Sequence, residues 1–357
     1  MNLNRIKKLI EQAISTFSLD LSGSIVLTEA ASNYYAFTPL IAARAGAEQV
    51  LALTRDSNFG TVKDIQNRLM DLADQWQLGT NISVITNRRD DRIGQADIIT
   101  NLGFVRPLDA NFLNRLKKTA AISLMWETWE FRSNDLDLET CRQLNLALLG
   151  TNEHHPQLKI FNYIGYIALK LLMEADIEIL FSHFIVLGSG EFAEQVTRTL
   201  KAVHAEVSHV NSKKKPSENR PKLLGLIERA DAVIVVDHHH DNQLIGPDGL
   251  VKAETLSTIN NGLTIIHICG NVDQADLVRN GISFWPSELA PAGYMSVATD
   301  YVGPKPLVDL HTAGLKVGEC LYHSRKKGLA AYDAEMQVLA TCDLAQGFAG
   351  YHGSPIK

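Results

Sequence analysis

Cysteine is scarce in this sequence, and its spacing excludes two classes of small site. The chain has four cysteines, Cys141, Cys269, Cys320 and Cys342, and no two of them have the Cys-x-x-Cys spacing. This pattern indicates neither a disulfide framework nor a zinc site, so we expect no metal and a reducing cytoplasm. No stretch approaches the roughly 18 consecutive apolar residues of a membrane span, so no membrane partner is expected.

The sequence also lacks an excess of positive charge. Its formal net charge is −6, whereas nucleic-acid binding usually needs a cationic surface that releases counterions. With 45% hydrophobic and 21% charged residues, the composition is that of a globular protein. A chain of 357 residues exceeds the usual size of a single hydrophobic core. We therefore expect two soluble globular domains and no nucleic-acid partner.

What the sequence does have is a repeated alternation of short apolar runs and helical patterns. In the first half, the apolar runs lie at residues 24–28, 49–53, 82–86, 96–100 and 120–125. Short apolar strands separated by helices are typical of a parallel sheet with helices on both faces. We predict an N-terminal Rossmann-like domain of residues 1–155 that binds the substrate and is completed by C-terminal helices within 312–357.

The same alternation restarts in the second half of the chain. Strands are predicted at 184–187, 206–210, 232–236 and 263–268. The most polar segment, 212–221, is predicted as a surface loop before a helix at 222–229. A second Rossmann-like domain is therefore expected over 156–311. The predicted fold class is α/β, with two doubly wound parallel sheets and a cleft between them.

A glycine turn follows the first strand of the second domain. Gly188 permits a tight turn, and Gly190 lets a pyrophosphate approach the backbone at the start of a helix. This context predicts a site for NAD or NADP, although a turn that only joins a strand to a helix is the plain alternative. The dinucleotide contacts predicted here are Gly188, Ser189, Gly190, Glu191 and Phe192.

The end of the second strand bears on the choice between NAD and NADP. Asn211, Ser212 and Lys213 stand where NAD-binding domains usually carry Asp or Glu. Hydroxyl and ammonium groups suit a 2′-phosphate, so NADP is slightly favoured, unless the lysines only form a solvated loop. Further cofactor contacts are predicted after the next strands, at His238, Cys269 and Gly270. The run Asp237 to Asp241, with three adjacent histidines, does not favour a metal site, because adjacent strand residues point to opposite faces.

From Gly188 onward, the order of features resembles the D-2-hydroxyacid dehydrogenase family. The similar segments are Ala230 to Val236, Cys269 to Asp273 and Leu310 to Gly314. The resemblance covers 152–318, about half of the chain, and implies a histidine that transfers a proton beside a carboxylate that raises its pKa. The resemblance assigns these roles to His311 and Glu288.

Cys269 stands where the family has its substrate-binding arginine, and a thiol cannot make that two-pronged contact. The substrate is then not a simple 2-hydroxy acid, its anion is held by another group, or the chemistry has changed.

Polar residues also follow the predicted strands of the N-terminal domain. Carboxyl ends of parallel strands meet at one edge of a sheet, where ligands bind. The predicted substrate contacts are Glu29, Asn33, Asn101, Glu127 and His154. Segment 25–56 also resembles the opening of a class I methyltransferase, with Asp56 as its acid, although the glycine-rich turn is missing.

These patterns together predict an NAD(P)-dependent oxidoreductase. The expected substrate is a small polar hydroxy or keto acid, or an amino-acid-like molecule, bound in the cleft between the domains. By analogy with enzymes of this architecture, a homodimer is expected. Two alternatives stay open: a methyltransferase-like transferase on the same frame, and a dinucleotide-binding protein that has lost catalysis.

Overall fold

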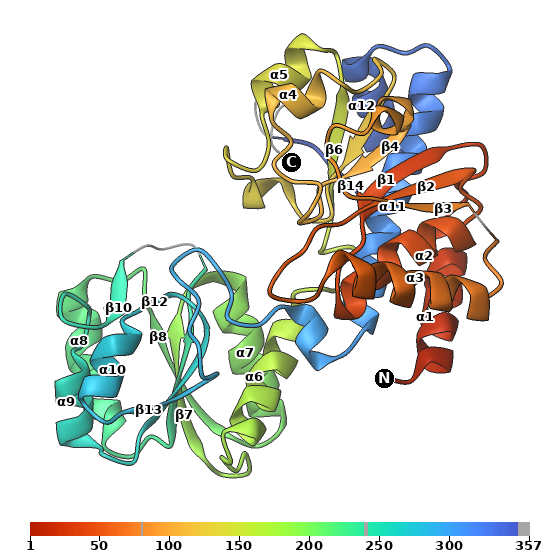
Figure 1. Cartoon of the computed structure of the whole chain (residues 1–357). Helices are drawn as coiled ribbons and strands as arrows, with labels where there is room; N and C mark the ends of the chain where they lie inside the picture. Colours follow the sequence, from red (N-terminus) through yellow and green to blue (C-terminus); the bar gives the residue numbers. More distant parts are fainter. Residues whose placement is uncertain (80, 239–241, 349–357) are drawn as a thin grey trace. The chain divides into compact units, whose positions relative to one another are not determined.

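The computed structural model describes residues 1–79, 81–238 and 242–348, which form two compact units (Figure 1). The first unit comprises Met1–Leu158 and the chain from Pro304 onward, and the second comprises Lys159–Gly303. Each unit has its own twisted parallel sheet covered by helices. The chain is thus an α/β protein with two Rossmann-like sheets, which confirms the predicted fold class.

The sheet of the first unit has the strand order β14-β6-β5-β4-β1-β2-β3 within the described residues. All neighbouring strands are parallel except β14 and β6. The chain moves outward from β1 in one direction as far as β3 and then resumes on the other side at β4, so the direction reverses between β1 and β4. The strands are β1 (Ile25–Glu29), β2 (Gln49–Leu53), β3 (Ile82–Ile85), β4 (Ile98–Thr100), β5 (Ala121–Ser123), β6 (Ala147–Thr151) and β14 (Ala345–Gln346).

The helices of the first unit include a long one, α11 (Lys305–Lys326), that comes from the end of the chain. This helix packs along β4, β5 and β6 and also contacts α1, α2 and α12. Residues 304–311, expected at the end of the second domain, therefore lie in the first unit. The other helices here are α1 (Leu3–Phe17), η1 (Asn33–Ala36), α2 (Phe37–Arg44), α3 (Val62–Gln75), η2 (Asp91–Gln95), α4 (Ala110–Leu113), η3 (Thr128–Glu130), α5 (Leu138–Gln143) and α12 (Ala331–Thr341).

The second unit is built on a sheet with the order β13-β11-β9-β7-β8, in which every neighbouring pair is parallel. Here the direction reverses between β7 and β9. The strands are β7 (His183–Gly188), β8 (Glu206–Asn211), β9 (Ala232–Val236), β11 (Thr264–Cys269) and β13 (Ser283–Trp285), with a separate pair β10 (Gln243–Ile245) and β12 (Asn271–Val272). The helices are α6 (Asn162–Glu174), α7 (Gly190–Ala202), α8 (Pro216–Ile227), α9 (Ala253–Ile259), α10 (Gln274–Arg279) and η4 (Thr299–Val302).

Continuous apolar runs form the central strands of both sheets because both of their faces are covered. All six residues of β7 and all five of β9 are buried. Phe184 and Val186 join the core on one face of the sheet, and Ile185 and Leu187 join the core on the other face. The period of two along a strand thus supplies both cores from one segment.

The loop predicted at 212–221 is wrong in its second half, because α8 already begins at Pro216. Proline is tolerated at the first helical position, where its missing N–H has no partner to lose. Asn219, 2% exposed, also ties the first turn to β8, since its amide donates to the carbonyl of Asn211 at 2.7 Å. The lysines and prolines of this segment indicated a loop, but the buried side chain of Asn219 stabilises a helix there.

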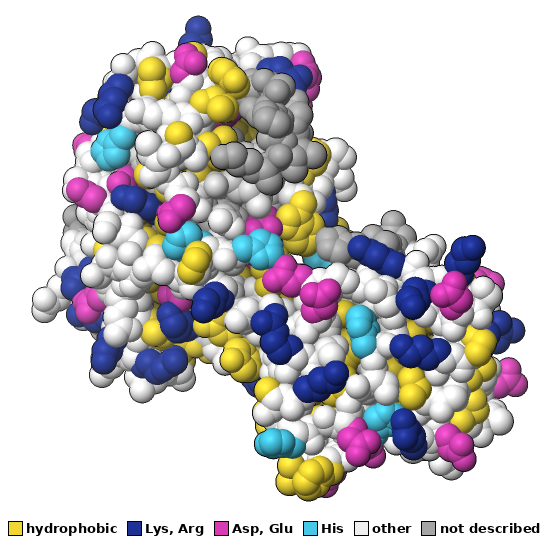
Figure 2. Space-filling model, turned by 180° about the vertical axis from the view of Figure 1, so that it is seen from behind, with side chains coloured by type: hydrophobic (Ala, Val, Ile, Leu, Met, Phe, Trp, Pro, Cys, Tyr) yellow, Lys and Arg dark blue, Asp and Glu magenta, His cyan; other side chains and the backbone are white. Residues whose placement is uncertain are grey.

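Surface charge is mixed on the face shown in Figure 2, where Lys and Arg side chains alternate with Asp and Glu over both units. Among residues 1–79, 81–238 and 242–348, no helix has both the length and the apolar character needed to cross a bilayer.

Candidate functional site

The glycine turn of the second unit lies at the reversal between β7 and β9. A Cβ atom on Gly188 would stand 1.9 Å from the carbonyl oxygen of Val236, so only glycine fits at the end of β7. Gly190, the first residue of α7, has φ +71°, a conformation that favours glycine. The sequence folds into this turn because both positions lack a side chain, and the turn brings the start of α7 to the edge of the sheet.

The first turn of α7 follows the glycine turn directly. Ser189 occupies the N-cap position, but its side chain does not cap the helix. Its Oγ donates instead to Oδ1 of Asp237 at 3.3 Å. Asp237 follows β9, is fully buried, and its Oδ2 has no hydrogen-bond partner among the described residues. The start of α7 thus combines the positive end of a helix dipole, which attracts anions, with a buried carboxylate oxygen that can accept from a hydroxyl.

Asn211, Ser212 and Lys213 form a turn directly after β8, beside the glycine turn. The backbone N–H of Ser212 donates to the Gly188 carbonyl at 3.2 Å, and that of Lys213 donates to Asn211 Oδ1 at 3.0 Å. The Oγ atom of Ser212 is inaccessible to solvent and has no partner in the described part of the chain. This turn therefore presents a hydroxyl and an exposed ammonium group on a backbone held by hydrogen bonds.

A cavity of about 790 Å³ lies against this turn. Its cationic lining side chains are Lys213, Lys214, Lys215 and Arg220, and Asp248 is the acidic one. The opposite wall comes from residues 242–244 and 248–250. A cavity of this size and positive charge suits an anionic ligand.

The remaining predicted cofactor contacts surround the same edge of the sheet. The rings of Phe192 and His238 have centroids 5.3 Å apart. Glu191 lies in the first turn of α7. His239, His240 and Asp241, considered for a metal site, lie outside the described residues.

Cys269 and Gly270 end β11 in a closed environment. Cys269 is fully buried, and burial raises the pKa of its thiol. The carbonyl of Gly270 accepts a hydrogen bond at 2.9 Å when Nε2 of His267 carries the proton. The thiol therefore stays neutral and supplies neither the charge nor the fork of an arginine at this position.

The first unit has a second polar edge, at the reversal between β1 and β4. Glu29, the last residue of β1, is 4% exposed, and burial raises the pKa of its carboxyl to about 7. Its Oε2 accepts from the backbone N–H of Phe104 at 2.9 Å. Asn101, just after β4, accepts from the N–H of Met125 at 2.7 Å, and its own buried Nδ2 has no partner among the described residues. Glu29 and Asn101 thus place a proton-exchanging group and an unused donor at the reversal.

His311 belongs to the same unit, on the buried side of α11. Its Nδ1 lies 2.7 Å from Oγ1 of Thr38 in α2, and its ring centroid is 5.9 Å from that of Tyr35 in η1. Asn33 begins η1, which follows β1. Burial lowers the pKa of the imidazole to about 3, so the ring is neutral at physiological pH.

Glu127 and His154 lie together after β5 and β6. Oε1 of Glu127 accepts from the N–H of Glu153 at 2.9 Å, and Oε2 lies 3.7 Å from Nε2 of His154. Burial raises the pKa of Glu130 to about 7, and burial together with the charges of Glu130 and Glu127 raises the pKa of Glu153 well above its ordinary value. These three glutamates share a buried cluster in which burial and the neighbouring charges favour the protonated form of Glu153. Within the described residues, no group of His, Cys, Asp and Glu side chains is arranged to hold a metal ion.

Glu288 and His311 lie in different units. Glu288 is exposed and follows β13 in the second unit, whereas His311 is 4% exposed in the first. The pairing of these residues, like the cleft between the domains, stays a prediction. Asp56, the acid of the methyltransferase-like interpretation, accepts from the backbone N–H of Val62 at 2.7 Å and so caps α3.

Sequence reasoning missed several of these groups. Thr38 gave no signal, because its role depends on α11 returning from the end of the chain. Asp237 was considered only as part of a histidine run, although its place directly after a buried strand was visible in the sequence. The same signal would have found Thr54 and Arg55 after β2 and Arg88 after β3.

Comparisons with known proteins bear on the fold. No family model matches the chain, and no curated protein matches it. The structure of a dipicolinate synthase from Bacillus halodurans matches with a TM-score of 0.52 and 14% identity, covering 86% of this chain and 99% of that one. The structure of a dipicolinate synthase from Bacillus subtilis matches with a TM-score of 0.51 and 17% identity, covering 87% and 98%.

A third structure comes from the family that the sequence resembles. It is the putative D-isomer specific 2-hydroxyacid dehydrogenase, NAD-binding, from Polaromonas sp., with a TM-score of 0.44, 12% identity and coverage of 84% and 99%. At such identities the likeness to the two dipicolinate synthases establishes the fold, and the chain is a two-unit Rossmann-type α/β protein. Its activity has to be argued from its own side chains.

Proposed function

We propose that this protein is an NAD(P)-dependent oxidoreductase whose second unit holds the dinucleotide. One observation carries the proposal. At the reversal between β7 and β9, Gly188 makes a tight turn, and Ser189 after it hydrogen-bonds to the buried Asp237. The positive dipole end at the start of α7 suits a pyrophosphate, and the unpaired Oδ2 of Asp237 suits a ribose hydroxyl.

We infer a preference for NADP over NAD. Ser212 has a buried hydroxyl without a partner, and the adjoining cavity is lined by Lys213, Lys214 and Lys215. A 2′-phosphate adds a dianion at this end of the cofactor, where a carboxylate in the same place would repel it. The positive charge of the cavity thus favours the phosphorylated form.

The substrate part of the proposal rests on the first unit. Glu29 and Asn101 offer an acceptor that exchanges protons near neutral pH and an unused amide donor, which suit a small hydroxy or keto acid or an amino-acid-like molecule. When bound, the nicotinamide supplies or accepts a hydride, so the substrate oxygen needs a partner for its proton. His311 is the proposed partner, and Glu29 is its competitor because its pKa of about 7 suits proton transfer better.

A binding experiment tests the cofactor assignment. NADPH and NADH are titrated calorimetrically into the wild type, into Lys213→Ala/Lys214→Ala, and into Lys201→Ala, an exposed lysine of α7 that serves as the control. We expect the double variant to bind NADPH about tenfold more weakly or worse, since charge-assisted bonds are lost, with little change for NADH. Equal losses for both cofactors would refute the phosphate contact. If S-adenosylmethionine binds and neither dinucleotide does, the oxidoreductase proposal is wrong.

Turnover separates the two candidate proton partners. With NADP and a panel of small hydroxy acids and amino acids, Glu29→Gln and His311→Gln are compared by their kcat at saturating cofactor. The partner is the residue whose loss lowers kcat by about 10²–10⁴-fold while cofactor affinity is kept. Binding of NADPH without turnover of any substrate in the panel would favour the dinucleotide-binding protein that has lost catalysis.

A further inference from the structure

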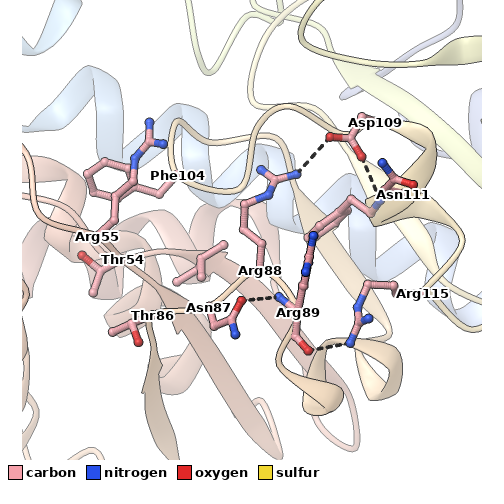
Figure 3. A pocket seen from close by; sticks show the side chains of 12 residues that line it. Thr54, Arg55, Thr86, Asn87, Arg88, Arg89, Phe104, Asp109, Asn111 and Arg115 are labelled. Carbon is pink, nitrogen blue, oxygen red and sulfur yellow. Dashed lines mark hydrogen bonds and ion pairs between the residues drawn. The ribbon is translucent and has the colours of Figure 1, made fainter.

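A second cavity, of about 620 Å³, lies in the first unit beyond the ends of β2 and β3 (Figure 3). It adjoins the edge at which Glu29 lies, since Phe104 lines the cavity and its backbone N–H donates to Oε2 of Glu29 at 2.9 Å. Its walls come from residues 53–55 at the end of β2, residues 86–89 after β3, and residues within 104–115, which include α4. Four arginines line it, Arg55, Arg88, Arg89 and Arg115, against one acidic residue, Asp109.

Two of these arginines are held by the protein. Arg88 donates from Nη1 to the carbonyl of Val105 at 2.7 Å and lies 3.8 Å from Asp109. Arg115 donates from Nη2 to the carbonyl of Arg89 at 2.6 Å and pairs with Asp91 at 3.2 Å. Arg88 and Arg115 therefore act mainly as scaffolding, and their charges still add to the positive field of the cavity.

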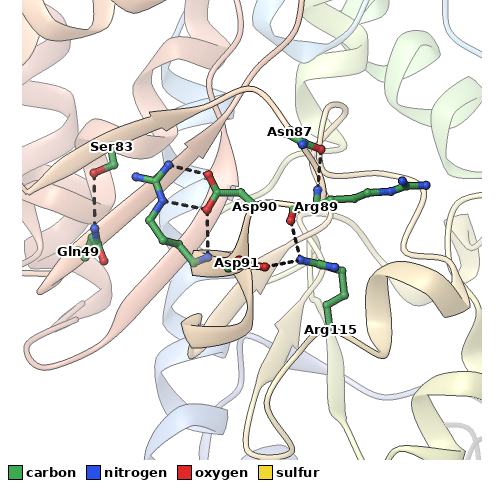
Figure 4. A network of polar contacts seen from close by, with 8 residues as sticks. Gln49, Ser83, Asn87, Arg89, Asp90, Asp91 and Arg115 are labelled. Carbon is green, nitrogen blue, oxygen red and sulfur yellow. Dashed lines mark hydrogen bonds and ion pairs between the residues drawn. The ribbon is translucent and has the colours of Figure 1, made fainter.

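Arg55 and Arg89 are different, because no carboxylate among the described residues pairs with either guanidinium. The guanidinium carbon of Arg55 lies 5.4 Å from the centroid of the Phe104 ring, which orients it without neutralising it (Figure 3). The backbone N–H of Arg89 donates to Oδ1 of Asn87 at 2.8 Å, within the polar network that holds the loop after β3 (Figure 4). The aromatic ring thus positions the Arg55 guanidinium, a hydrogen bond holds the Arg89 backbone, and neither charge pairs with a carboxylate of the described residues.

Thr54 gives an independent indication of a ligand. Its side chain lines the cavity and is 1% exposed, and its Oγ1 has no hydrogen-bond partner in the described part of the chain. A buried hydroxyl without a partner costs free energy unless a ligand or water satisfies it. Thr54 thus adds a hydroxyl donor to the wall that also carries the unpaired guanidinium of Arg55, and hydroxyl and guanidinium donors together suit oxyanions.

We propose that this cavity binds the phosphate group of a small phosphorylated molecule, with Arg55 and Arg89 as its cationic contacts and Thr54 as a hydroxyl donor. Phosphate is favoured over a single carboxylate because two unpaired guanidinium charges match a dianion, and planar guanidinium forks match its oxygens. The volume of about 620 Å³ leaves room for an organic part of nucleotide size beyond the phosphate. The site lies wholly in the first unit and so does not depend on the dinucleotide proposed for the second.

The test uses inorganic pyrophosphate as the probe, titrated calorimetrically at low ionic strength, with malonate as the carboxylate comparison. The variants are Arg55→Ala, Arg89→Ala and the matched control Arg68→Ala, an exposed arginine of α3 that removes the same charge from the same unit. Lys213→Ala/Lys214→Ala is included to remove binding at the second unit. We expect Arg55→Ala and Arg89→Ala each to weaken pyrophosphate binding about tenfold or more, and Arg68→Ala to change it little.

Each result decides the proposal. The proposal is supported when only Arg55→Ala and Arg89→Ala weaken pyrophosphate binding, and when the lysine variant still binds pyrophosphate. It also requires that NADPH affinity stays unchanged in the two arginine variants. It is overturned when pyrophosphate binding is lost only in the lysine variant, when Arg68→Ala is as harmful as Arg89→Ala, or when malonate binds as tightly as pyrophosphate. If the wild type does not bind NADPH, the proposed function is refuted, whereas the proposal of a phosphate site in the first unit is unaffected.

Discussion

Oγ1 of Thr38 and Nδ1 of His311 lie 2.7 Å apart in the buried interior of the first unit. This hydrogen bond joins α2, from the start of the chain, to α11, from its end. Because burial lowers the pKa of His311 to about 3, the ring stays neutral, and Thr38 fixes the orientation of a neutral imidazole. The residue assigned by resemblance as an acid/base therefore depends on a threonine that no motif indicated.

Removal of the Thr38 hydroxyl should destabilise the protein measurably. Thr38→Val keeps the shape of the side chain but leaves the buried Nδ1 of His311 without a partner, at a cost of about 1–3 kcal/mol. Chemical denaturation measures the loss. Thr54→Val is the matched control in the same unit, because its hydroxyl is buried without a partner, and we expect it to be neutral or stabilising. If both variants lose the same free energy of unfolding, the hydrogen bond between Thr38 and His311 does not stabilise the protein.

Gly188→Ala should destabilise the second unit and abolish dinucleotide binding. The added Cβ would stand 1.9 Å from a backbone carbonyl, which cannot move without disturbing β9, so we expect a loss of about 1–3 kcal/mol. Gly225→Ala is the control, since its Cβ meets nothing within 4 Å inside α8 and removes a helical glycine, a gain of about 0.5–1 kcal/mol. Melting temperatures measured without NADPH report the change in stability, and their increase with NADPH reports dinucleotide binding. A Gly188→Ala variant that melts like the wild type would contradict the geometry of the turn.

The sequence predicted the core strands well and the peripheral elements poorly, for a physical reason. Buried strands such as β7 and β9 carry unbroken apolar runs, so their positions could be predicted within one or two residues. Two-residue β14 and three-residue β13 have no such pattern, because they depend on neighbouring strands that are distant in sequence. The start of α8 was missed for a similar reason, since the buried amide of Asn219 stabilises it.

The same distinction applies to the candidate sites. Gly188 and Gly190 could be predicted because their conformations allow almost no other residue, so local sequence reports on local geometry. The environment of His311 could not be predicted, because burial in α11 depends on the sheet of the first unit. The cavity after β2 and β3 is an intermediate case. The place of Arg55 after a predicted strand was visible in the sequence, but its meeting with Arg89 depends on the parallel pairing of β2 and β3.

Cys342 should react with iodoacetamide before the other cysteines. A hydrogen bond from the thiol of Cys320 is the main cause that lowers the pKa of Cys342 to about 7. Burial raises the pKa of Cys141 to about 12 and raises that of Cys269 beyond the physiological range. Because the thiolate is the nucleophile, mass spectrometry of peptides alkylated at pH 7.5 should find Cys342 labelled first. Cys320→Ser keeps a donor and should preserve this order, whereas Cys320→Ala should slow the labelling; early labelling of Cys269 would contradict the burial.

Glu153→Gln should make the stability of the protein less sensitive to pH. In the folded protein, burial first and then the charges of Glu130 and Glu127 raise the pKa of Glu153 well above its ordinary value of 4.5. The folded state therefore keeps a proton that the unfolded chain loses above pH 4.5, and the free energy of unfolding falls as pH rises from there toward the folded pKa. Each unit of raised pKa corresponds to about 1.4 kcal/mol.

A glutamine carries no titrating proton, and its amide can still donate to Glu130 in place of the carboxyl proton. We therefore expect unfolding by urea, followed from about pH 5 to pH 8, to give a shallower decline for Glu153→Gln than for the wild type. Glu139→Gln, in the same unit, is the control because its side chain is 62% exposed and should leave the decline unchanged. A decline of the same steepness in Glu153→Gln would mean that Glu153 is already ionised in the folded protein. The cluster would then hold its negative charge by hydrogen bonds from Trp129 and the backbone, and not by sharing a proton.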